Sequence, residues 1–262
     1  MLDATIDGIR STLGGDPSTV CFARAPGRVN LIGDHTDYQD GFCLPAAIDR
    51  EVRIGFRRRD DAEVRVASPA TDAGFEAIVD TATLVLAERG RPSVGLDGAL
   101  ASTVPIGAGL SSSAAVEVAV CLALAEVAEW PLAGRDLALA AQEIEHRATG
   151  MPCGVLDQMA SVFGVADHAM LLDCRALTVE SLPISNDVAL LVVNSGVERR
   201  LTTSAYADRR AACEAAAAKL GVEALRDATA NQVANDPIAR HVVSENTRTL
   251  DFAEALRRND LD

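Results

Sequence analysis

The chain has 262 residues, of which 48% are hydrophobic and 3% aromatic, and its formal net charge is −14. This length suits one large domain or two smaller ones, with a sizeable core of Ala, Val and Leu. The acidic balance argues against a nucleic-acid binder, which needs a basic face. We expect no membrane span, because glutamates interrupt the apolar stretch from residue 114 to residue 130.

The cysteines are scattered, and no CxxC pair occurs among them. This spacing argues against a zinc site and against a redox motif. The N-terminus lacks the basic-then-apolar pattern of a secretory signal. We therefore expect reduced thiols in a cytoplasmic protein.

The first third of the chain shows mostly strand patterns. Apolar and charged residues alternate between residues 51 and 66, which predicts a half-solvated antiparallel sheet. The other elements expected here are a helix at 2–13, a strand at 20–25, a turn at Pro26 and Gly27, a strand at 75–79 and a helix at 82–89.

A loop of small residues, Gly107–Ala115, follows an expected strand at 95–104 and precedes a helical pattern. The free N–H groups and the dipole of a helix N-terminus favour an anion there, and glycines let a phosphate approach the backbone closely. The loop is not a Walker A loop, because no lysine precedes the serines. A Ser-rich N-cap on a core helix is the other interpretation, and the local pattern leaves both open.

Polar side chains are concentrated between Arg28 and Tyr38, directly after a short apolar segment. Two carboxylates, an imidazole and a guanidinium suit a ligand with many hydroxyl groups, since each hydroxyl needs a donor and an acceptor. A solvated hairpin turn is an alternative, because polar clusters are common in turns. A metal site formed by Asp34, His35 and Asp37 is another.

Two acidic residues stand out in the middle of the chain. Glu145 lies near the C-terminal end of an expected helix, where the helix dipole disfavours an acid, which hints at a role such as metal binding. Asp157 follows a Gly-Pro loop and falls in the first turn of a helix expected at 155–163. An ordinary helix-start acid is the alternative for Asp157.

The last part of the chain is mostly helical. The pattern predicts paired strands at 169–173 and 178–182, a buried strand at 188–193, an Ala-rich helix ending at Gly221 and a helix at 239–258. Thr202, Thr203 and Ser204 offer caps for the Ala-rich helix, with Tyr206 in its first turn. The change from strands to helices places a domain boundary near residue 185.

Three stretches together resemble the galactokinase family, a member of the GHMP small-molecule kinase superfamily. Gly27–Tyr38 looks like the galactokinase signature, and Gly107–Ala115 is similar to the phosphate loop of the superfamily. Gly150–Gln158 is similar to a third motif of the galactokinase family. Weaker similarity through residues 194–214 extends the resemblance over most of the chain.

The resemblance implies an α+β fold with the two-domain architecture of GHMP kinases. Residues 1–185 would form an N-terminal α/β domain of the ribosomal-protein-S5-domain-2-like type, with the sugar signature and the phosphate loop. Residues 186–262 would form part of a truncated ferredoxin-like α+β domain.

The resemblance also implies ATP-dependent phosphorylation of galactose at the anomeric hydroxyl, the first step of galactose catabolism, by a monomeric enzyme that uses ATP and Mg²⁺. Asp157 would be the catalytic base and Arg28 its partner, because a sugar hydroxyl is a poor nucleophile until a base takes its proton. The residues implied for the sugar pocket are Asp34, His35, Asp37, Cys153, Gly154 and Tyr206. Those implied for ATP are Gly107, Gly109, Leu110, Ser111, Ser112, Ser113 and Ala114, and those for Mg²⁺ are Ser113 and Glu145.

The chain departs from the family pattern in three places. Asp34 stands where the family usually has Glu, and residues 67–102 form a shorter segment than in typical galactokinases. The glycine-rich motif that family members carry near their C-terminal end does not follow residue 258. We therefore expect these 262 residues to be an incomplete kinase with little activity and a tendency to aggregate. A kinase for another sugar, a catalytically silent sugar and ATP sensor, and an inactive fragment are the alternatives.

Overall fold

The computed structural model describes residues 2–68, 73–193 and 205–260. The chain forms two compact units. Unit 1 comprises residues 1–27, 49–106 and 110–151, and unit 2 comprises residues 28–48, 107–109 and 152–262. The expected division into residues 1–185 and 186–262 stays a prediction, but the compact units are interleaved along the chain and have no single boundary.

The sheet of unit 1 has the strand order β1-β3-β5-β4. These strands are β1 (Cys21–Asn30), β3 (Pro45–Arg58), β5 (Leu96–Ser102) and β4 (Val64–Ala67). β3 runs antiparallel to β5, with Val52 opposite Ser102, whereas β4 runs parallel to β5. The expectation of a wholly antiparallel sheet is therefore wrong at β4. The reason is that a helix connects β4 to β5, and such a crossover joins parallel strands.

Two further expectations in unit 1 are wrong. No turn interrupts the chain at Pro26, because β1 continues to Asn30. Proline is tolerated there since β1 is an edge strand of the sheet. The strand expected at 75–79 lies inside α2 (Ala73–Glu88), because its apolar residues continue a helical spacing that ends at the fully buried Val85 and Leu86.

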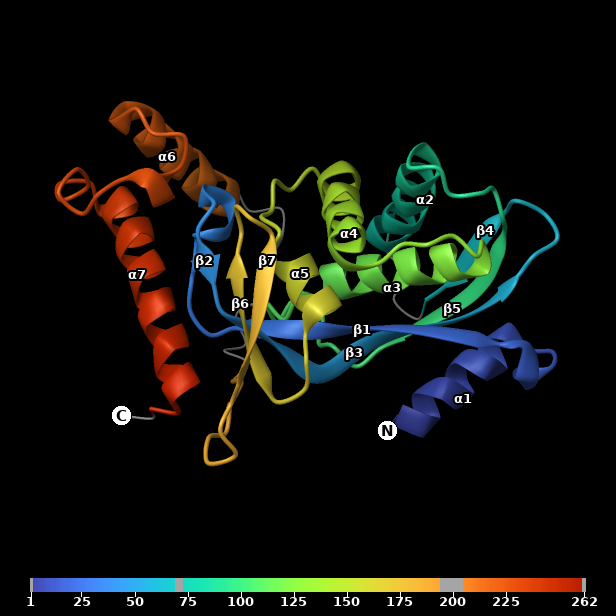
Figure 1. The fold of residues 1–262 in the computed structure, drawn as a ribbon. Coiled ribbons are helices and arrows are strands. Elements are labelled where there is room, and N and C mark those ends of the chain that lie inside the picture. Colours follow the sequence, from blue (N-terminus) through green and yellow to red (C-terminus); the bar gives the residue numbers. More distant parts are fainter. Residues whose placement is uncertain (1, 69–72, 194–204, 261–262) are drawn as a thin grey trace. The chain divides into compact units, whose positions relative to one another are not determined.

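Four helices cover the two faces of this sheet (Figure 1). α1 (Leu2–Leu13) packs on β5 from one side, and α2 packs with α3 (Ser112–Val127) and α4 (Gly134–Thr149) on the other. α3 is buried on nearly all sides, which explains its sequence of Ala, Val and Leu. The central helix of unit 1 therefore begins directly after the small-residue loop.

Unit 2 contains a three-stranded antiparallel sheet of order β2-β6-β7, as expected for the last two strands. Its elements are β2 (Phe42–Cys43), β6 (His168–Asp173), β7 (Thr178–Pro183), α5 (Leu156–Phe163), α6 (Ala205–Leu220), α7 (Pro237–Arg258) and the short 3-10 helices η2 (Asp37–Gln39) and η3 (Leu225–Asp227). One apolar cluster joins α6, η3 and α7, and a second joins α7 to the sheet.

The strand expected at 188–193 is absent from the described part of the chain. This apolar run has no regular secondary structure, and Leu191 and Val193 are 87% and 75% exposed. The expectation fails because, among the described residues, no strand pairs with the run, and burial requires partners for its N–H and C=O groups. The caps expected at Thr202, Thr203 and Ser204 lie outside the described residues.

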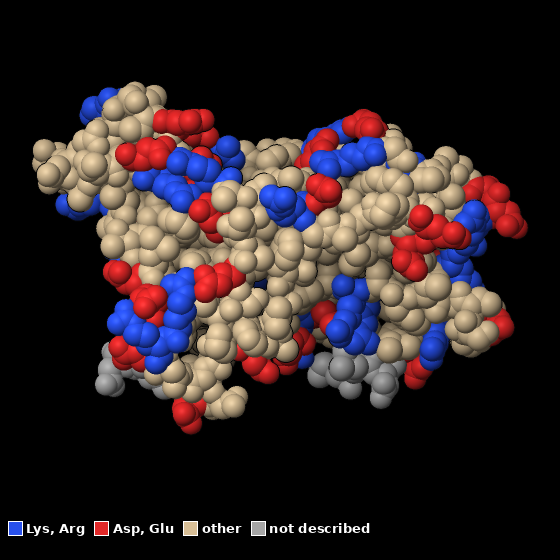
Figure 2. Space-filling model, viewed as in Figure 1, with Lys and Arg blue, Asp and Glu red and all other residues tan. Residues whose placement is uncertain are grey.

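Charges of both signs are interspersed on the face shown in Figure 2. Many arginines there and elsewhere are paired; Arg147, for example, contacts Glu88 and Glu143. In the part of the chain that the structure describes, no helix combines the length and apolar character that crossing a membrane requires.

Candidate active site

A loop of residues 33–42, here called the polar loop, carries several of the expected site residues. Two backbone hydrogen bonds close its base: the Leu31 N–H donates to the Leu44 carbonyl, and the Leu44 N–H donates to the Ile32 carbonyl. The buried Thr36 hydroxyl lies 2.8 Å from the Gly33 carbonyl oxygen and 2.7 Å from that of Phe42. Gly33 has φ +101°, and a Cβ there would lie 2.6 Å from the Phe42 carbonyl oxygen, so only glycine fits.

Asp37, Gly154 and Tyr206 meet in unit 2 although they lie far apart in the sequence. The carboxylate of Asp37 lies directly over Gly154, where any side chain would collide with it. The Gly154 N–H donates to the Tyr206 hydroxyl oxygen over 3.3 Å. Burial, and next the negative charge of Asp157, raise the pKa of Asp37 to about 6. This arrangement presents a carboxylate and a phenol to a small polar ligand.

His35 lies beside the same group of side chains. Its Nδ1 is 2.7 Å from the Tyr38 hydroxyl oxygen, and its ring centroid is 6.2 Å from that of Tyr206. Asp34 is exposed and accepts from the Asn30 side-chain amide over 3.0 Å. Within the described residues, no group of three or more His, Cys, Asp or Glu could hold a metal ion, so a metal site built from Asp34, His35 and Asp37 is not supported.

Arg28 and Asp157 form an ion pair in unit 2. The Arg28 Nε and Nη2 atoms lie 2.8 Å and 2.5 Å from Oδ1 of Asp157, and Nη1 donates to the Gly109 carbonyl oxygen over 2.7 Å. The Arg28 side chain is 12% exposed and that of Asp157 33%. The planar guanidinium thus joins the first turn of α5 to the small-residue loop at Gly109. A lysine could not do this, because it lacks the fork of N–H donors.

The small-residue loop leads into α3 through left-handed backbone. Gly107, Gly109 and Ser111 have φ of +71°, +74° and +57°. Ser111 makes no side-chain cap bond, although it occupies the N-cap position. The loop also approaches β1 closely, since a Cβ on Gly27 would lie 2.7 Å from the Leu110 carbonyl oxygen. The first N–H groups of a helix have no partner within that helix, so the start of α3 suits an anion.

Ser113 lies in the first turn of α3, and Glu145 lies on α4, which packs against α3. Glu145 is only 4% exposed. Its backbone carbonyl accepts from the Thr149 hydroxyl over 2.7 Å, and among the described residues its carboxylate has no ion-pair partner. A buried carboxylate is costly without a positive partner, so Glu145 fits a cation ligand.

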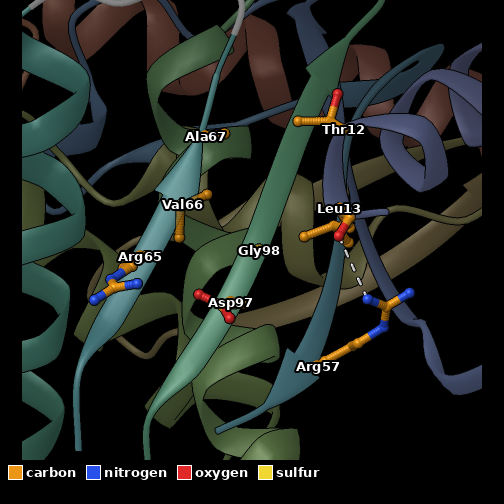
Figure 3. Close-up of a pocket in the computed structure, with 8 residues that line it drawn as sticks. All are labelled: Thr12, Leu13, Arg57, Arg65, Val66, Ala67, Asp97 and Gly98. Carbon is orange, nitrogen blue, oxygen red and sulfur yellow. Dashed lines mark hydrogen bonds between the residues drawn. The ribbon is translucent and has the colours of Figure 1, made fainter. Parts of the chain in front are cut away.

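Unit 1 also contains a separate cavity of about 500 Å³ between α1 and strands β4 and β5 (Figure 3). Two of its charged side chains make hydrogen bonds inside the protein. Arg57 donates to the carbonyls of Gly14 and Asp16, and Asp97 accepts from Arg59. The cavity is lined by Thr12, Leu13, Arg57, Arg65, Val66, Ala67, Asp97 and Gly98, a set that includes none of the expected site residues.

Sequence reasoning missed a set of residues on α7 that contact the polar loop. His241, Glu245 and Asn246 hydrogen-bond to the backbone of Asp34, Gly33 and Phe42. In the sequence these residues look like the ordinary polar face of a helix. Only the burial of Glu245 and Asn246 in the structure distinguishes them from surface residues. No local signal in the sequence could have identified them.

Two family models match the chain. The galactokinase galactose-binding signature matches residues 10–58, and the GHMP kinases N terminal domain matches residues 76–165. These matches include the polar loop, the small-residue loop and Asp157.

Individual proteins are similar over most of the chain. A galactokinase of Roseiflexus sp. (strain RS-1) is 42% identical over 91% of this chain and 68% of that protein. The crystal structure of Lactococcus lactis galactokinase complexed with galactose superposes with a TM-score of 0.87 at 27% identity, covering 99% of this chain and 75% of that one.

A more distant structure shares the fold alone. The mevalonate kinase of L. major, solved with R-mevalonate, has a TM-score of 0.59 at 19% identity, over 92% of this chain and 70% of that one. The mixed α+β fold is therefore that of GHMP kinases, and the extent and identity of the match to the Roseiflexus protein place this chain in the galactokinase family.

Proposed function

We propose that this protein transfers the γ-phosphoryl group of ATP to the anomeric hydroxyl of galactose. One observation carries the proposal: Arg28 pairs with Asp157 and also donates a hydrogen bond to Gly109 in the small-residue loop. It places a carboxylate base and a guanidinium beside the loop proposed to bind the phosphates. Family membership and the similarity to a galactose-bound galactokinase support the sugar.

In the proposed mechanism, Asp157 accepts the proton of the anomeric hydroxyl as that oxygen bonds to the γ-phosphorus. The bond between this phosphorus and the β–γ bridging oxygen breaks, and ADP leaves. General-base catalysis of this kind contributes about 10²–10⁴ in rate. Arg28 keeps the Asp157 carboxylate in place through two N–H donors on Oδ1 and adds positive charge near the transferring group. Asp37, His35 and Tyr206 orient the sugar, with Asp34, Cys153 and Gly154 at the edges of the pocket.

We assign the ATP phosphates to the loop from Gly107 to Ala114 and Mg²⁺ to Ser113 and Glu145. Held by these two residues, Mg²⁺ would offset the negative charge of the phosphates. The residues fit this ion, because a hydroxyl and a buried carboxylate are the hard oxygen ligands that Mg²⁺ prefers. We also propose that the protein is a monomer. We assign it to the cytoplasm, in line with its six free cysteines.

The direct test is a coupled assay of ADP release on the product of the natural reading frame, with galactose, glucose and a pentose as acceptors. We expect galactose to be preferred, because buried polar groups reject a sugar that leaves them unpaired. A higher kcat/KM for glucose or the pentose would contradict the proposed substrate. No turnover and no galactose binding by calorimetry would contradict the proposed function.

The affinity for galactose should depend on pH through Asp37. Its raised pKa of about 6 means that the carboxyl is ionised at pH 8 and largely protonated at pH 5. Charge-assisted hydrogen bonds are roughly twice as strong as neutral ones, so we expect about fivefold weaker binding at pH 5. Calorimetric titration at several pH values measures this.

The matched control for the pH experiment is Asp37→Asn, which keeps the shape of the side chain but cannot ionise. Its weaker affinity should be independent of pH between 5 and 8. Folding stability depends on pH in the opposite direction from galactose affinity. Ionisation of Asp37 lowers the stability of the folded chain as the pH rises from about 4 to about 6. An equal pH dependence in parent and variant would rule out Asp37 as the titrating group.

Gly154→Ala should weaken galactose binding without changing the small-residue loop. The new Cβ would occupy the position of the Asp37 carboxylate and force that side chain away. We expect at least a tenfold higher Kd for galactose, because small displacements of a positioning group have large effects. Gly8→Ala is the control, since a Cβ at Gly8 meets nothing within 4 Å. Unchanged galactose affinity in Gly154→Ala would show that Asp37 does not bind the sugar.

A further inference from the structure

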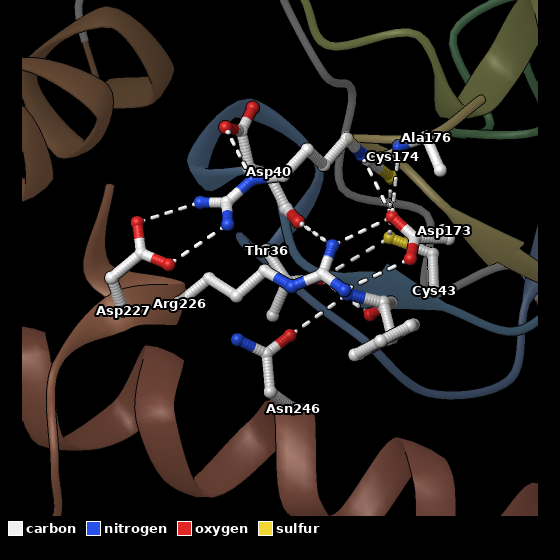
Figure 4. A network of polar contacts seen from close by, with 11 residues as sticks. Thr36, Asp40, Cys43, Asp173, Cys174, Ala176, Arg226, Asp227 and Asn246 are labelled. Atoms are coloured by element: carbon white, nitrogen blue, oxygen red, sulfur yellow. Dashed lines mark hydrogen bonds and ion pairs between the residues drawn. The ribbon is translucent and has the colours of Figure 1, made fainter. Parts of the chain in front are cut away.

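The back of the polar loop is fixed to α7 by hydrogen bonds at both of its ends. Glu245 Oε1 accepts from the N–H groups of Gly33 and Asp34 over 2.9 Å and 3.2 Å. Asn246 Oδ1 accepts from the Phe42 N–H over 2.8 Å (Figure 4). His241 Nε2 lies 2.9 Å from the Asp34 carbonyl oxygen and donates to it. All four bonds go to the loop backbone, so they fix its path whatever its side chains do.

Glu245 is the central group of this contact. It is 7% exposed, and its second carboxylate oxygen pairs with Arg248. Burial opposes its ionisation, but the Gly33 N–H, Arg248 and the Asp34 N–H together lower the pKa of Glu245 below the usual value of a glutamate. Glu245 is therefore a buried anion at neutral pH, and such a group is tolerated only where hydrogen bonds compensate its desolvation.

The loop packs closely against α7 and is hydrogen-bonded to the segment around η3. A Cβ on Gly41 would collide with Asn246 Oδ1 and lie 2.9 Å from the Thr36 carbonyl oxygen. On the side of η3, the Gln39 Oε1 atom accepts from the Leu225 N–H over 3.1 Å. Arg226 donates to the Asp40 carbonyl over 2.7 Å (Figure 4). The proposed sugar ligands Asp34, His35 and Asp37 lie on this same loop, so its path decides where they point.

We propose that Glu245 is a positioning residue for the sugar: its carboxylate fixes the backbone at Gly33 and Asp34 and thereby sets the affinity for galactose without touching it. The inference rests on the proposed function. It concerns residues on α7 outside both matched family models, which end at residues 58 and 165. Residues that hold ligand-contacting groups in position typically change the affinity for the ligand about 10–100-fold when they are replaced.

Glu245→Gln tests the proposal, because it preserves size but removes the charge that strengthens both N–H bonds. We expect the KM for galactose to rise about tenfold, with the KM for ATP and kcat within about twofold of the parent. The control is Glu254→Gln on the same helix, which loses exposed ion pairs to Arg257 and Arg258 and should change none of these constants.

Hydrogen exchange at the amides of Gly33 and Asp34 provides a readout that does not require activity. Both amides should exchange faster in Glu245→Gln than in Glu254→Gln. Normal galactose KM together with unchanged exchange would overturn the proposal, and so would a lower melting temperature with unchanged KM. If the parent protein does not bind galactose, the proposed function is wrong, while the exchange experiment still decides whether Glu245 fixes the loop.

Discussion

Asp157→Asn should lower kcat for galactose phosphorylation by about 10²–10⁴ while leaving galactose and ATP binding largely intact. Asparagine keeps the shape of the side chain and can still accept a hydrogen bond from Arg28, but it cannot take a proton. Steady-state kinetics together with calorimetric Kd values separate the loss of the base from a loss of binding. Near-normal turnover by Asp157→Asn would remove Asp157 from the mechanism.

The control for this variant is Asp136→Asn. Asp136 also lies in the first turn of a helix, α4, but it is exposed. Both substitutions remove a carboxylate that interacts favourably with a helix dipole, worth about 0.3–1 kcal/mol. Equal losses of stability with a loss of turnover only in Asp157→Asn would distinguish catalysis from helix stabilisation.

Arg28→Lys should lower kcat by about 10²–10³, the size of effect seen when one donor that stabilises the transition state is lost. Lysine keeps the charge but cannot bond Asp157 through two nitrogens and the Gly109 carbonyl through a third. The same kinetic assay measures the effect. Arg24→Lys on the same strand is the control, because the Arg24 side chain is 73% exposed and pairs with Glu51 at 3.6 Å.

The double variant Arg28→Lys/Asp157→Asn adds a sharper test. If Arg28 acts through Asp157, the double variant should be little worse than Asp157→Asn alone, because residues that act as a unit are not additive. Fully additive losses would mean that Arg28 and Asp157 act independently, and the ion pair would then be a structural contact.

Local sequence patterns determined the elements that carry the site. Proline, glycine and apolar spacing placed a loop before α3 and put Asp157 in the first turn of α5, since these signals depend only on neighbouring residues. The same reasoning failed at 188–193, where it predicted burial from composition alone. Burial of a strand depends on partners elsewhere, and the described residues offer none to this run.

Only the tertiary structure decided which of these residues meet. Arg28 and Asp157 are 129 positions apart, and Glu245 contacts Gly33 across 212 positions. Hydrophobic periodicity specifies which face of an element is buried but not which distant polar group lies opposite it. Asp37 illustrates the point: its sequence context is an ordinary polar turn, and its raised pKa arises because folding buries it over Gly154 and near Asp157.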